Sequence, residues 1–414
     1  MASSGLAAPV SEADVALIID GVVSFVRRFV QPLHDRNTAL LEDPRAAYDT
    51  DGRPAPAVAE LRRRTRTAAA EAGYYTLFAP EELGGGGQGA VMSFLLYETL
   101  FREFGPGRIL IEDVVGKWNR GPSGLIRYFS DALRHEISGD LMSGRTTFCF
   151  ALSEPDAGSD AWALTTRAVR VAGGWRITGV KQWISDSPYA DHALVFAVTD
   201  DVARAARQGG ITAFFVPMDA DGVEVASVIK LFGEIGGTRA ILSFTEVFVP
   251  DSSVVGEEGA GLSLARMGVS LGRMHNAGRA VGTAHWALAR ATEYAKVRKT
   301  FGELISSHQA IQFKLADSAI EIYAGHTMAL DCARRIDAGE KADKQLAMVK
   351  AFTCDTSFEV LDRCIQVHGG MGLVNETRLV DGWHAQRVSR LADGSAEVMR
   401  RNVARALLRG DLDL

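Results

Sequence analysis

Hydrophobic positions recur with helical spacing in the first and last parts of the chain, and their spacing is different in the middle part. Over roughly residues 11–145, apolar positions recur every three to four residues on segments that keep one polar side, such as 69–73, 98–104 and 131–142. This spacing predicts amphipathic helices. We therefore expect an N-terminal all-α domain over residues 1–146.

From about residue 148 to residue 250, hydrophobic and polar residues alternate instead. Residues 166–178 alternate on either side of a Gly-Gly turn, which is the signature of a β-hairpin. Further strands are expected at 193–198, 212–216 and 241–249. Short strands at this spacing, without helices between them, predict an antiparallel β-barrel or sandwich over residues 147–254.

Helical periodicity returns at about residue 261 and lasts to the end of the chain. One long helix has an apolar face marked by residues that step by four, four and three: Ile311, Leu315, Ala319 and Ile322. Phe313 and Ile320 lie off that face, so we expect this helix to be buried on more than one side. A last helix is expected from Ser395 to Leu408. Together the patterns predict an α+β multi-domain protein whose C-terminal domain, residues 255–414, is a four-helix bundle.

The composition is that of an ordinary globular protein. Of 414 residues, 47% are hydrophobic and 23% are charged, and a chain of this length can bury a large core without disulfides or a structural metal. The 45 basic and 51 acidic side chains leave a net charge of −6. Proteins that bind nucleic acids usually show a strongly basic face, so we expect no nucleic-acid partner.

The cysteines and the N-terminus predict the compartment. Four cysteines form no C-x-x-C pair and no disulfide-scaffold spacing, which indicates a reducing environment. Glu12, Asp14 and Asp20 interrupt the first apolar stretch, and no basic segment precedes it. Because a membrane span needs about 20 mostly apolar residues, neither a span nor a signal peptide is predicted. We expect a cytoplasmic protein, and the excess of arginine over lysine is consistent with a GC-rich bacterial genome.

Some motifs match familiar patterns in an unsuitable context. Residues 84–89 match G-x-G-x-x-G, but no strand leads into them and no βαβ alternation follows, as dinucleotide binding requires. Residues 268–272 match the hydrolase pattern G-x-S-x-G, but within a helical stretch. His135-Glu136 lacks the second histidine of a zinc-binding helix, and no other His/Cys cluster has metal-ligand spacing. No metal site is expected.

Two segments carry more distinctive chemistry. Residues 150–160 (FALSEPDAGSD) run from an expected strand into a loop with hydroxyls and small residues, whose amides suit a phosphate or a polarised ring edge. About thirty residues on, KQWIS places Trp183 two residues from the hydroxyl of Ser185. Each segment also has a plain structural interpretation, a β-turn and a half-buried tryptophan. The residues alone leave both interpretations open.

Taken together, these segments resemble the acyl-CoA dehydrogenase family. FALSEPDAGSD is similar to that family's loop after the first barrel strand, and KQWIS to its flavin-contacting strand. Three more segments resemble the family in the same order: RKTFG at 298–302 with His308-Gln309, QVHGG at 366–370, and ADGS at 392–395. The likeness extends over roughly residues 60–410 and agrees with the helix–barrel–helix layout.

The resemblance implies FAD, held between the barrel and the C-terminal helical domain. By position, the flavin would be lined or covered by Phe150, Leu152, Ser153, Trp183 and Ser185. Ser159 would lie near the pyrophosphate or near the CoA part of the substrate. The implied cofactor-binding set also includes Ser395 and Glu397, at the start of the last helix.

The resemblance also implies a homo-oligomer, since members of this family are typically dimers or tetramers in which a neighbouring subunit contacts the adenine half of FAD. The matching positions are Arg298, Thr300, Phe301, His308, Gln309, Gln366, His368, Gly369 and Gly370. Physically, an arginine suits a phosphate, and adjacent glycines allow close backbone approach. An ordinary helix C-cap is the alternative for residues 366–370. We expect a tetramer, with a dimer as the second possibility.

The family's reaction removes a proton α to a thioester and transfers a hydride from Cβ to the flavin. It needs one carboxylate as base and hydrogen bonds on the thioester oxygen. The family's usual glutamate position holds Asp393, one methylene shorter, and the backbone N–H of Gly394 would contact the thioester oxygen. Gly272 occupies the position of an alternative glutamate, and Arg273 beside it is expected to orient the carboxylate or to contact substrate. The plain alternative for Asp393 is a cap of the last helix.

Three functions are therefore compared. The first is an FAD-dependent acyl-CoA dehydrogenase of fatty acid β-oxidation, which forms a trans-2-enoyl-CoA and passes electrons to an electron-transfer flavoprotein. The second is a flavin oxidase of the same fold, because nitroalkane oxidase also carries an aspartate at the position of Asp393. The third is a non-catalytic homologue that binds flavin or CoA. The length and branching of the acyl group are not readable from the sequence.

Overall fold

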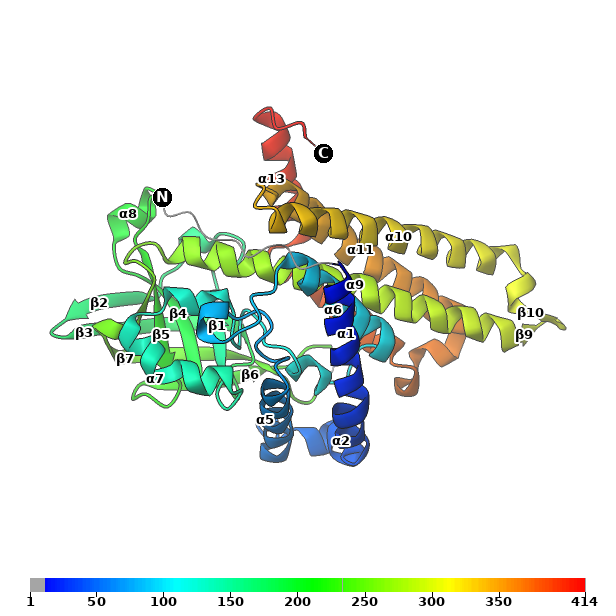
Figure 1. Cartoon of the computed structure of the whole chain (residues 1–414), viewed down its shortest axis with the longest axis horizontal. Helices are drawn as coiled ribbons and strands as arrows, with labels where there is room; N and C mark the ends of the chain where they lie inside the picture. Colours follow the sequence, from blue (N-terminus) through cyan, green and yellow to red (C-terminus); the bar gives the residue numbers. More distant parts are fainter. Residues whose placement is uncertain (1–11, 233, 414) are drawn as a thin grey trace. The chain divides into compact units, whose positions relative to one another are not determined.

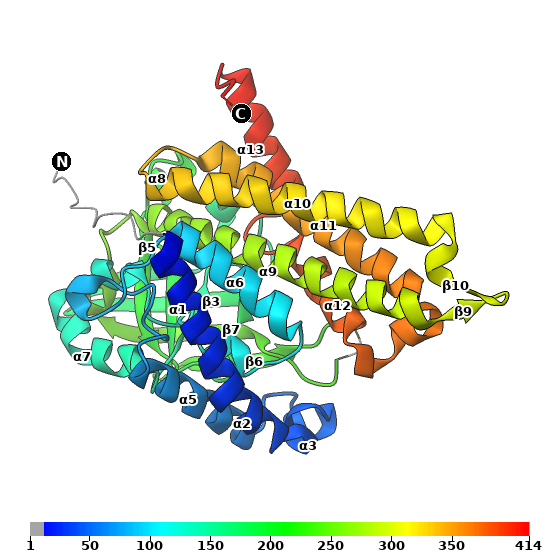
Figure 2. The same ribbon diagram turned by 45° about the vertical axis from the view of Figure 1, so that its right-hand side comes forward.

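The structure is a computed structural model that describes residues 12–232 and 234–413 (Figures 1 and 2). The predicted N-terminal domain starts at residue 1, and its first eleven residues lie outside the described part. The chain divides into two compact units, each described by itself below. One, here called the β unit, comprises Ser24–Gly87 and Ile109–Val269; the other, the helical unit, comprises Met1–Val23, Gln88–Arg108 and Ser270–Leu414. The division into three consecutive domains stays a prediction.

The β unit is built around one eight-stranded sheet, drawn mostly in green in Figure 1. The strands are β1 (Phe148–Ala151), β2 (Arg167–Val171), β3 (Gly174–Ser185), β4 (His192–Val198), β5 (Ile211–Pro217), β6 (Val223–Ile229), β7 (Arg239–Pro250) and β8 (Val254–Val255). Their order is β6-β7-β3-β2-β4-β5-β8, and β1 pairs with β4. The hairpin expected at 166–178 is confirmed as β2–β3, and the three other expected strands are β4, β5 and β7.

Two details of the sheet differ from the sequence prediction. β1 runs parallel to β4, with Phe148 opposite His192, and β2 meets β4 in parallel at a single residue pair. The sheet is therefore mixed, although its other ladders are antiparallel. β6 was not predicted, because its side chains are mostly exposed or half-buried and no apolar run marks it.

Both faces of the central strands are buried. Along β4, Leu194 and Phe196 enter one core, which also holds side chains of helix α7 (Asp131–Met142). On the other face of β4, Ala193, Val195 and Ala197 enter a second core together with Trp175 and Phe244. Strands that are buried on both faces read as continuous apolar runs, as β4 and β5 do. The other α-helices described in this unit are α2 (Gln31–Asp35), α3 (Thr38–Leu41), α4 (Pro44–Ala47), α5 (Pro56–Glu71) and α8 (Asp201–Ala205).

The helical unit consists of long helices joined by short connections. They are α1 (Glu12–Phe25), α6 (Ala90–Phe104), α9 (Gly261–Val297), α10 (Gln309–Asp337), α11 (Asp343–His368), α12 (Leu379–Ser389) and α13 (Ala396–Leu408), with a hairpin of β9 (Lys299–Thr300) and β10 (Glu303–Leu304). The first residues of α9, up to Val269, and the last of α1 are grouped with the β unit. Side chains of α6, α9, α10 and α11 share one hydrophobic core.

Small residues let α9 approach α6 closely. A Cβ at Gly282 would come within 2.3 Å of the Glu98 carbonyl oxygen, and one at Gly278 within 2.6 Å of the Phe94 carbonyl oxygen. Asp337, the last residue of α10, accepts hydrogen bonds from the backbone N–H groups of Ala90 and Val91. This carboxylate therefore caps the N-terminus of α6, whose first N–H groups have no partner within the helix.

Helix α10 confirms one expectation and corrects another. Ile311, Leu315 and Ile322 pack against the core as expected. Ala319, which was expected on the same face, is exposed. Phe313 and Ile320, however, are largely exposed, as is Tyr323 with 74% of its surface accessible. The expectation that this helix is buried on more than one side is therefore wrong for the single chain, because among residues 12–232 and 234–413 these side chains stay largely accessible. An apolar strip remains on the surface.

Candidate functional site

Asp393 lies in the loop that joins α12 to α13. Its φ is +55° and that of Gly394 is +95°, so two successive residues adopt the left-handed conformation and turn the chain into α13. Aspartate and asparagine tolerate this conformation better than most residues, which favours Asp over the longer Glu here. At position 394 the φ of +95° is a backbone conformation that residues with a side chain rarely adopt, so the turn favours glycine there.

The helix cap is Ser395 rather than Asp393. The Ser395 side chain accepts a hydrogen bond from the Val398 N–H at 3.3 Å, and α13 begins at Ala396 and ends at Leu408, close to the predicted range. The alternative interpretation of Asp393 as a capping residue is therefore wrong. Its carboxylate points instead to α9, where Asn276 Nδ2 donates to Asp393 Oδ2 at 2.6 Å.

Two cations fix the backbone on either side of this carboxylate. Arg273, one turn before Asn276 on α9, donates from Nε to the Asp393 carbonyl oxygen at 3.1 Å. Lys350 on α11 is completely buried, and its Nζ donates to the Gly394 carbonyl oxygen at 2.6 Å. A longer contact of 3.4 Å joins the same Nζ to the Arg390 carbonyl oxygen. The recorded hydrogen bond of Arg273 thus reaches the main chain of Asp393, and the prediction that Arg273 orients the carboxylate or contacts substrate stays a prediction.

The surroundings of Asp393 make it a stronger base than an exposed aspartate. Burial raises the pKa of its carboxyl, although the charges of Lys350 and Arg273 and the hydrogen bond from Asn276 act in the opposite direction. Burial also lowers the pKa of Lys350 and of Arg273. A raised carboxyl pKa in a site with one oriented carboxylate is typical of a group that accepts a proton during catalysis.

The two distinctive segments of the β unit lie side by side. The backbone N–H of Gln182 donates to the Ser153 carbonyl oxygen at 2.9 Å, and Lys181 Nζ donates to the Leu152 carbonyl oxygen at 3.1 Å. The structure therefore brings the loop after β1 and the KQWIS strand into one place, as their shared role in the prediction requires. Ser159 lies further along the loop and is exposed.

Trp183 is presented to solvent by a β-bulge. The ladder of β3 with β7 slips between Lys181 and Ile184, and Trp183 there has a φ of +67°. A bulge turns a side chain away from its regular direction, and 53% of this tryptophan is exposed although Lys181 and Ile184 close to it are buried. An exposed indole in a strained position is unusual in a purely structural role. Phe150, in contrast, packs its ring on Trp118 and on Phe196, each at 4.8 Å.

A buried ion pair joins the KQWIS strand to the loop after β1. Lys181 Nζ lies 2.8 Å from Glu154 Oε1, and both side chains are almost fully buried. Glu154 also accepts hydrogen bonds from the backbone N–H groups of Thr165 and Thr166. Burial alone would raise the pKa of Glu154, but Lys181 and these hydrogen bonds lower it to about 2. This carboxylate is a fixed structural anion.

A second network fixes the end of β3. Asp186, directly after Ser185, accepts a hydrogen bond from Arg120 Nη1 at 3.4 Å. Arg120 also pairs with buried Asp113, to which Arg62 of α5 donates at 2.6 Å. Neighbouring guanidinium groups lower the pKa of both carboxyls although burial opposes this. The strand that carries Trp183 and Ser185 therefore ends on a rigid support.

The expected adenine-side residues form two groups at one end of the helical unit. Thr300 Oγ1 lies 3.2 Å from His308 Nε2, and Phe301, at the tip of the β9–β10 hairpin, is fully exposed. Arg298 and Gln309 flank them and are also exposed. In the second group, Gln366, Gly369 and Gly370 are exposed at the end of α11.

His368 differs from the rest of its group. It is buried, its Nδ1 lies 2.7 Å from the Cys364 carbonyl oxygen, and its ring stacks on Tyr294 of α9 at 4.6 Å. Its side chain therefore joins the ends of α9 and α11 rather than facing solvent. Ser395 caps α13, and the exposed Glu397 lies in the first turn, where hydrogen bonds from its own backbone N–H and from Ser395 lower its pKa.

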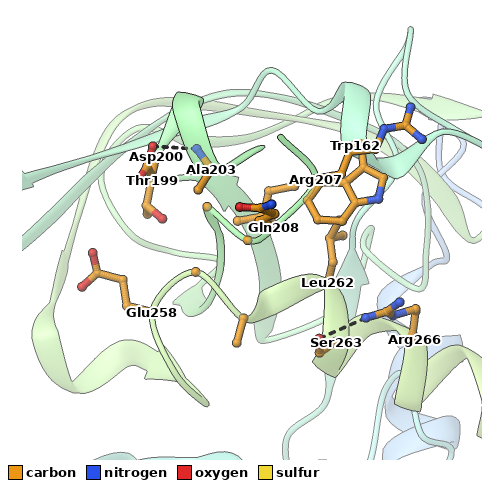
Figure 3. Close-up of a pocket in the computed structure, with 15 residues that line it drawn as sticks. Trp162, Thr199, Asp200, Ala203, Arg207, Gln208, Glu258, Leu262, Ser263 and Arg266 are labelled. Atoms are coloured by element: carbon orange, nitrogen blue, oxygen red, sulfur yellow. Dashed lines mark hydrogen bonds between the residues drawn. The ribbon is translucent and has the colours of Figure 1, made fainter. Parts of the chain in front are cut away.

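A pocket of about 710 Å³ opens in the β unit (Figure 3). Its lining comes from the segment around α8, with Asp200, Arg207 and Gln208, from Glu258 just before α9, and from the first turns of α9, with Ser263 and Arg266. The indole of Trp162 stands at one side, next to Leu262. None of these residues was predicted, because they come from segments far apart in the sequence; only the neighbouring Asp160, which lies 3.1 Å from Arg207, ends a predicted segment.

Among residues 12–232 and 234–413, no group of three or more His, Cys, Asp or Glu side chains is placed to hold a metal ion. None of the helices in these ranges combines the length and apolar character that crossing a membrane requires. The four cysteines are buried and free of disulfides.

Comparison with known proteins identifies the family of this chain. Two family models match: the acyl-CoA dehydrogenase middle domain over residues 149–247 and the acyl-CoA dehydrogenase C-terminal domain over residues 259–408. The human mitochondrial short-chain specific acyl-CoA dehydrogenase is 33% identical over 340 residues, which cover 81% of this chain and 80% of that protein.

Two further similarities agree with this match. Subunit CarC of the caffeyl-CoA reductase–Etf complex of Acetobacterium woodii is 29% identical and covers 82% of this chain and 88% of its own length. Butyryl-CoA dehydrogenase from Megasphaera elsdenii has a TM-score of 0.80 at 26% identity, over 97% of this chain and 100% of that structure.

The chain belongs to the acyl-CoA dehydrogenase family. It is therefore an enzyme of the oxidoreductase class, and the predicted resemblance and fold class are confirmed. Family membership likewise confirms the expected FAD cofactor. The exposed indole of Trp183 with the nearby hydroxyl of Ser185 fits an aromatic ring system with polar edges.

Sequence reasoning missed two residues of the Asp393 site. Asn276 lies 117 positions away from Asp393 and Lys350 lies 44 positions away from Gly394, so no local spacing connects them. A weak signal for Lys350 did exist, since a lysine stands inside the apolar run AMVKAF. Such a lysine is rarely buried unless it is paired.

Proposed function

We propose that the protein is an acyl-CoA dehydrogenase in which Asp393 removes the α-proton of an acyl-CoA thioester. The observation that carries this proposal is the carboxylate of Asp393, which is held by Asn276 and flanked by backbone fixed through Arg273 and Lys350. Its raised pKa supports the role of proton acceptor.

In the proposed step the α-C–H bond breaks and its proton moves to a carboxylate oxygen of Asp393. Oδ2 already accepts from Asn276, so Oδ1 is the oxygen proposed to take the proton. The N–H of Gly394 is proposed to donate to the thioester oxygen, which gains negative charge as the proton leaves. Bound FAD would supply the acceptor for the hydride that leaves Cβ, which completes a trans-2-enoyl-CoA.

The residues proposed to hold FAD are those that the structure exposes. In the β unit, Trp183 and Ser185 would contact the ring system, supported by the backbone of Leu152 and Ser153. In the helical unit, Arg298, Thr300 and Gln309 would contact the nucleotide part of FAD bound by a second subunit. The buried His368 is proposed to support this region rather than to touch the cofactor.

We further propose that the pocket of the β unit takes the phosphate-bearing end of CoA. Arg207 and Arg266 supply cationic groups, and the start of the 37-residue helix α9 adds backbone N–H groups. The N-terminus of a helix favours anions because its first N–H groups are unpaired and its dipole is positive there. The exposed Ser159 lies in the loop that leads to Trp162 at the pocket.

The proposed assembly is a homo-oligomer, a tetramer or otherwise a dimer. Exposed apolar side chains of the helical unit support it, since Phe301, Phe313 and Tyr323 would be unusual on a monomer's surface. A stable interface of this kind buries roughly 2,000 Å² or more. Light scattering that finds a monomer with bound FAD would contradict this part of the proposal.

The proposed electron acceptor is an electron-transfer flavoprotein, because the relative CarC belongs to a reductase–Etf complex. That relative also favours a second candidate, the same chemistry run in the direction of enoyl-CoA reduction. The proposed location is the bacterial cytoplasm, which the free, buried cysteines support.

The test is an anaerobic titration of the purified yellow protein with a panel of acyl-CoA thioesters, followed by flavin absorbance. Bleaching by at least one saturated thioester is the expected result. Bleaching by none of them, together with rapid turnover of nitroethane with oxygen, would establish the oxidase alternative. A protein that binds flavin and reacts with neither would be a non-catalytic homologue.

A further inference from the structure

Two lysines of α11 are buried, and they perform different tasks. Lys344 and Lys350 lie on the same helix and are 4% and 0% exposed. Lys344 donates to the carbonyl oxygen of Asp411 at 3.0 Å and pairs with its carboxylate, at the end of the chain. Lys350 donates to the carbonyl oxygens of Gly394 and Arg390, on either side of Asp393.

The contacts of Lys350 have a plain structural interpretation. Arg390 follows α12, and the last carbonyl groups of a helix need partners from outside the helix. A lysine is a suitable partner at this end. By that interpretation Lys350 would stabilise the fold as Lys344 does, and it would have no separate effect on chemistry.

The contacts of Lys350 are not confined to the end of α12. The shorter contact of Lys350 is to Gly394, the residue directly after Asp393, and not to the helix end. Arg273 holds the Asp393 carbonyl oxygen from the opposite helix, α9. The two left-handed residues of the turn are thus each fixed by a cation through their own carbonyl groups. The hydrogen bonds recorded for Arg273 and Lys350 at this turn go to main-chain carbonyl oxygens and not to the Asp393 carboxylate.

We propose that Lys350 is a positioning residue for Asp393: it fixes the 390–394 loop from α11, so that the shorter aspartate presents Oδ1 to the α-proton while Asn276 holds Oδ2. This inference rests on the proposed function. It explains how an aspartate replaces the family's glutamate, because a loop held at Gly394 and at Asp393 cannot drift away from the substrate. A misplacement of about 1 Å can cost roughly 10²-fold in rate.

The charge of Lys350 has a second consequence. The titratable and charged groups that face Asp393 are Arg273 and Arg279 of α9 and Lys350 and Cys354 of α11. Removing the ammonium group removes one stabilising charge from the carboxylate. The carboxylate form of Asp393 would then appear only at higher pH, and the acid limb of any proton-transfer rate would move upwards in pH.

The experiment separates proton abstraction from hydride transfer. Phenylacetyl-CoA and acetyl-CoA carry α-protons but no β-hydrogen that could leave as hydride, so exchange of their α-protons in D₂O reports only on the base. Exchange is followed by NMR and mass spectrometry over a range of pH with the FAD-loaded enzyme. Three variants are compared with the wild type: Lys350→Met, Lys350→Gln and the matched control Lys344→Met.

We expect Lys350→Met to lose roughly 10²-fold in exchange rate and to move the acid limb to higher pH. Lys350→Gln keeps a hydrogen-bond donor without the charge, so it should recover part of the rate while the limb stays shifted. Lys344→Met should exchange like the wild type, although thermal unfolding shows a comparable loss of stability. If Lys350→Met exchanges like Lys344→Met at every pH, Lys350 is structural and the proposal is wrong.

The same data distinguish failure of the positioning role from failure of the proposed function. Flavin bleaching by the acyl-CoA panel is measured on each protein in parallel. A wild type that neither exchanges α-protons nor is bleached by any thioester rejects the proposed function, and the positioning role with it. A wild type that is active, with a Lys350→Met variant equally active, rejects only the positioning role.

Discussion

Two carboxylates in this protein lie beside a completely buried lysine, and their pKa values move in opposite directions. In the β unit, Lys181 bonds the carboxylate of Glu154 directly, and the pKa of Glu154 falls to about 2. In the helical unit, Lys350 bonds the main chain next to Asp393, and burial raises the pKa of Asp393.

The difference shows how a carboxylate beside a buried lysine can become either a fixed anion or a base. The oxygens of Glu154 are occupied by an ammonium group and by two backbone N–H groups, so the charged form is strongly favoured. In contrast, the recorded hydrogen bond to the carboxylate of Asp393 comes from the neutral amide of Asn276. A charge that fixes the backbone leaves the carboxylate itself able to accept a proton.

The largest expected effect follows from removing the base. In Asp393→Asn the amide is nearly isosteric, can still accept from Asn276, and tolerates the left-handed backbone. We expect FAD binding and fold to persist, while single-turnover flavin reduction by a good acyl-CoA falls by about 10²–10⁴-fold. Rates equal to the wild type at equal FAD occupancy would remove Asp393 from the mechanism.

The second effect concerns stability. Lys181→Met leaves Glu154 as a buried, unpaired charge, and breaking a buried pair from one side typically costs about 3–5 kcal/mol. Urea unfolding should show this loss, and the double variant Lys181→Met/Glu154→Gln should recover much of it because no charge then stays uncompensated. A double variant no more stable than the single one would mean that the ion pair is not the source of the loss.

A smaller effect is expected from Asn276→Leu, which removes the donor to Asp393 Oδ2 with little change in volume. A hydrogen bond to a charged group contributes about 1.5–3 kcal/mol. Because this donor favours the carboxylate form, its loss raises the pKa of Asp393 further and moves the acid limb of flavin reduction to higher pH. A lower rate with an unmoved limb would indicate a packing defect instead.

The comparison also shows which parts of the site the sequence could predict. Trp183 and Ser153 belong to continuous motifs, and Ser395 caps a helix whose start the pattern of residues 395–408 marked. Asn276 and Lys350 reach Asp393 from two other helices, and only tertiary packing brings them there. The parallel pairing of β1 with β4 was hidden for the same reason, since a local hairpin pattern cannot reveal partners that are distant in sequence.

The smallest expected effect is a difference of sign in the pH dependence of stability. The folded pKa of Glu154 lies below its ordinary 4.5, so its contribution to stability is present above that value and is lost as pH falls towards 2. The folded pKa of Asp393 lies above its ordinary 3.8, so this carboxylate costs stability at neutral pH, and protonation at lower pH relieves the cost. Glu154→Gln should therefore be less stable than the wild type at neutral pH, and Asp393→Asn more stable. Both differences should shrink as the solution is acidified, because protonation makes each wild-type side chain neutral as well. Unfolding by urea at a series of pH values measures both differences. Two differences of the same sign would contradict the assignment of Glu154 as a stabilising anion and of Asp393 as a base.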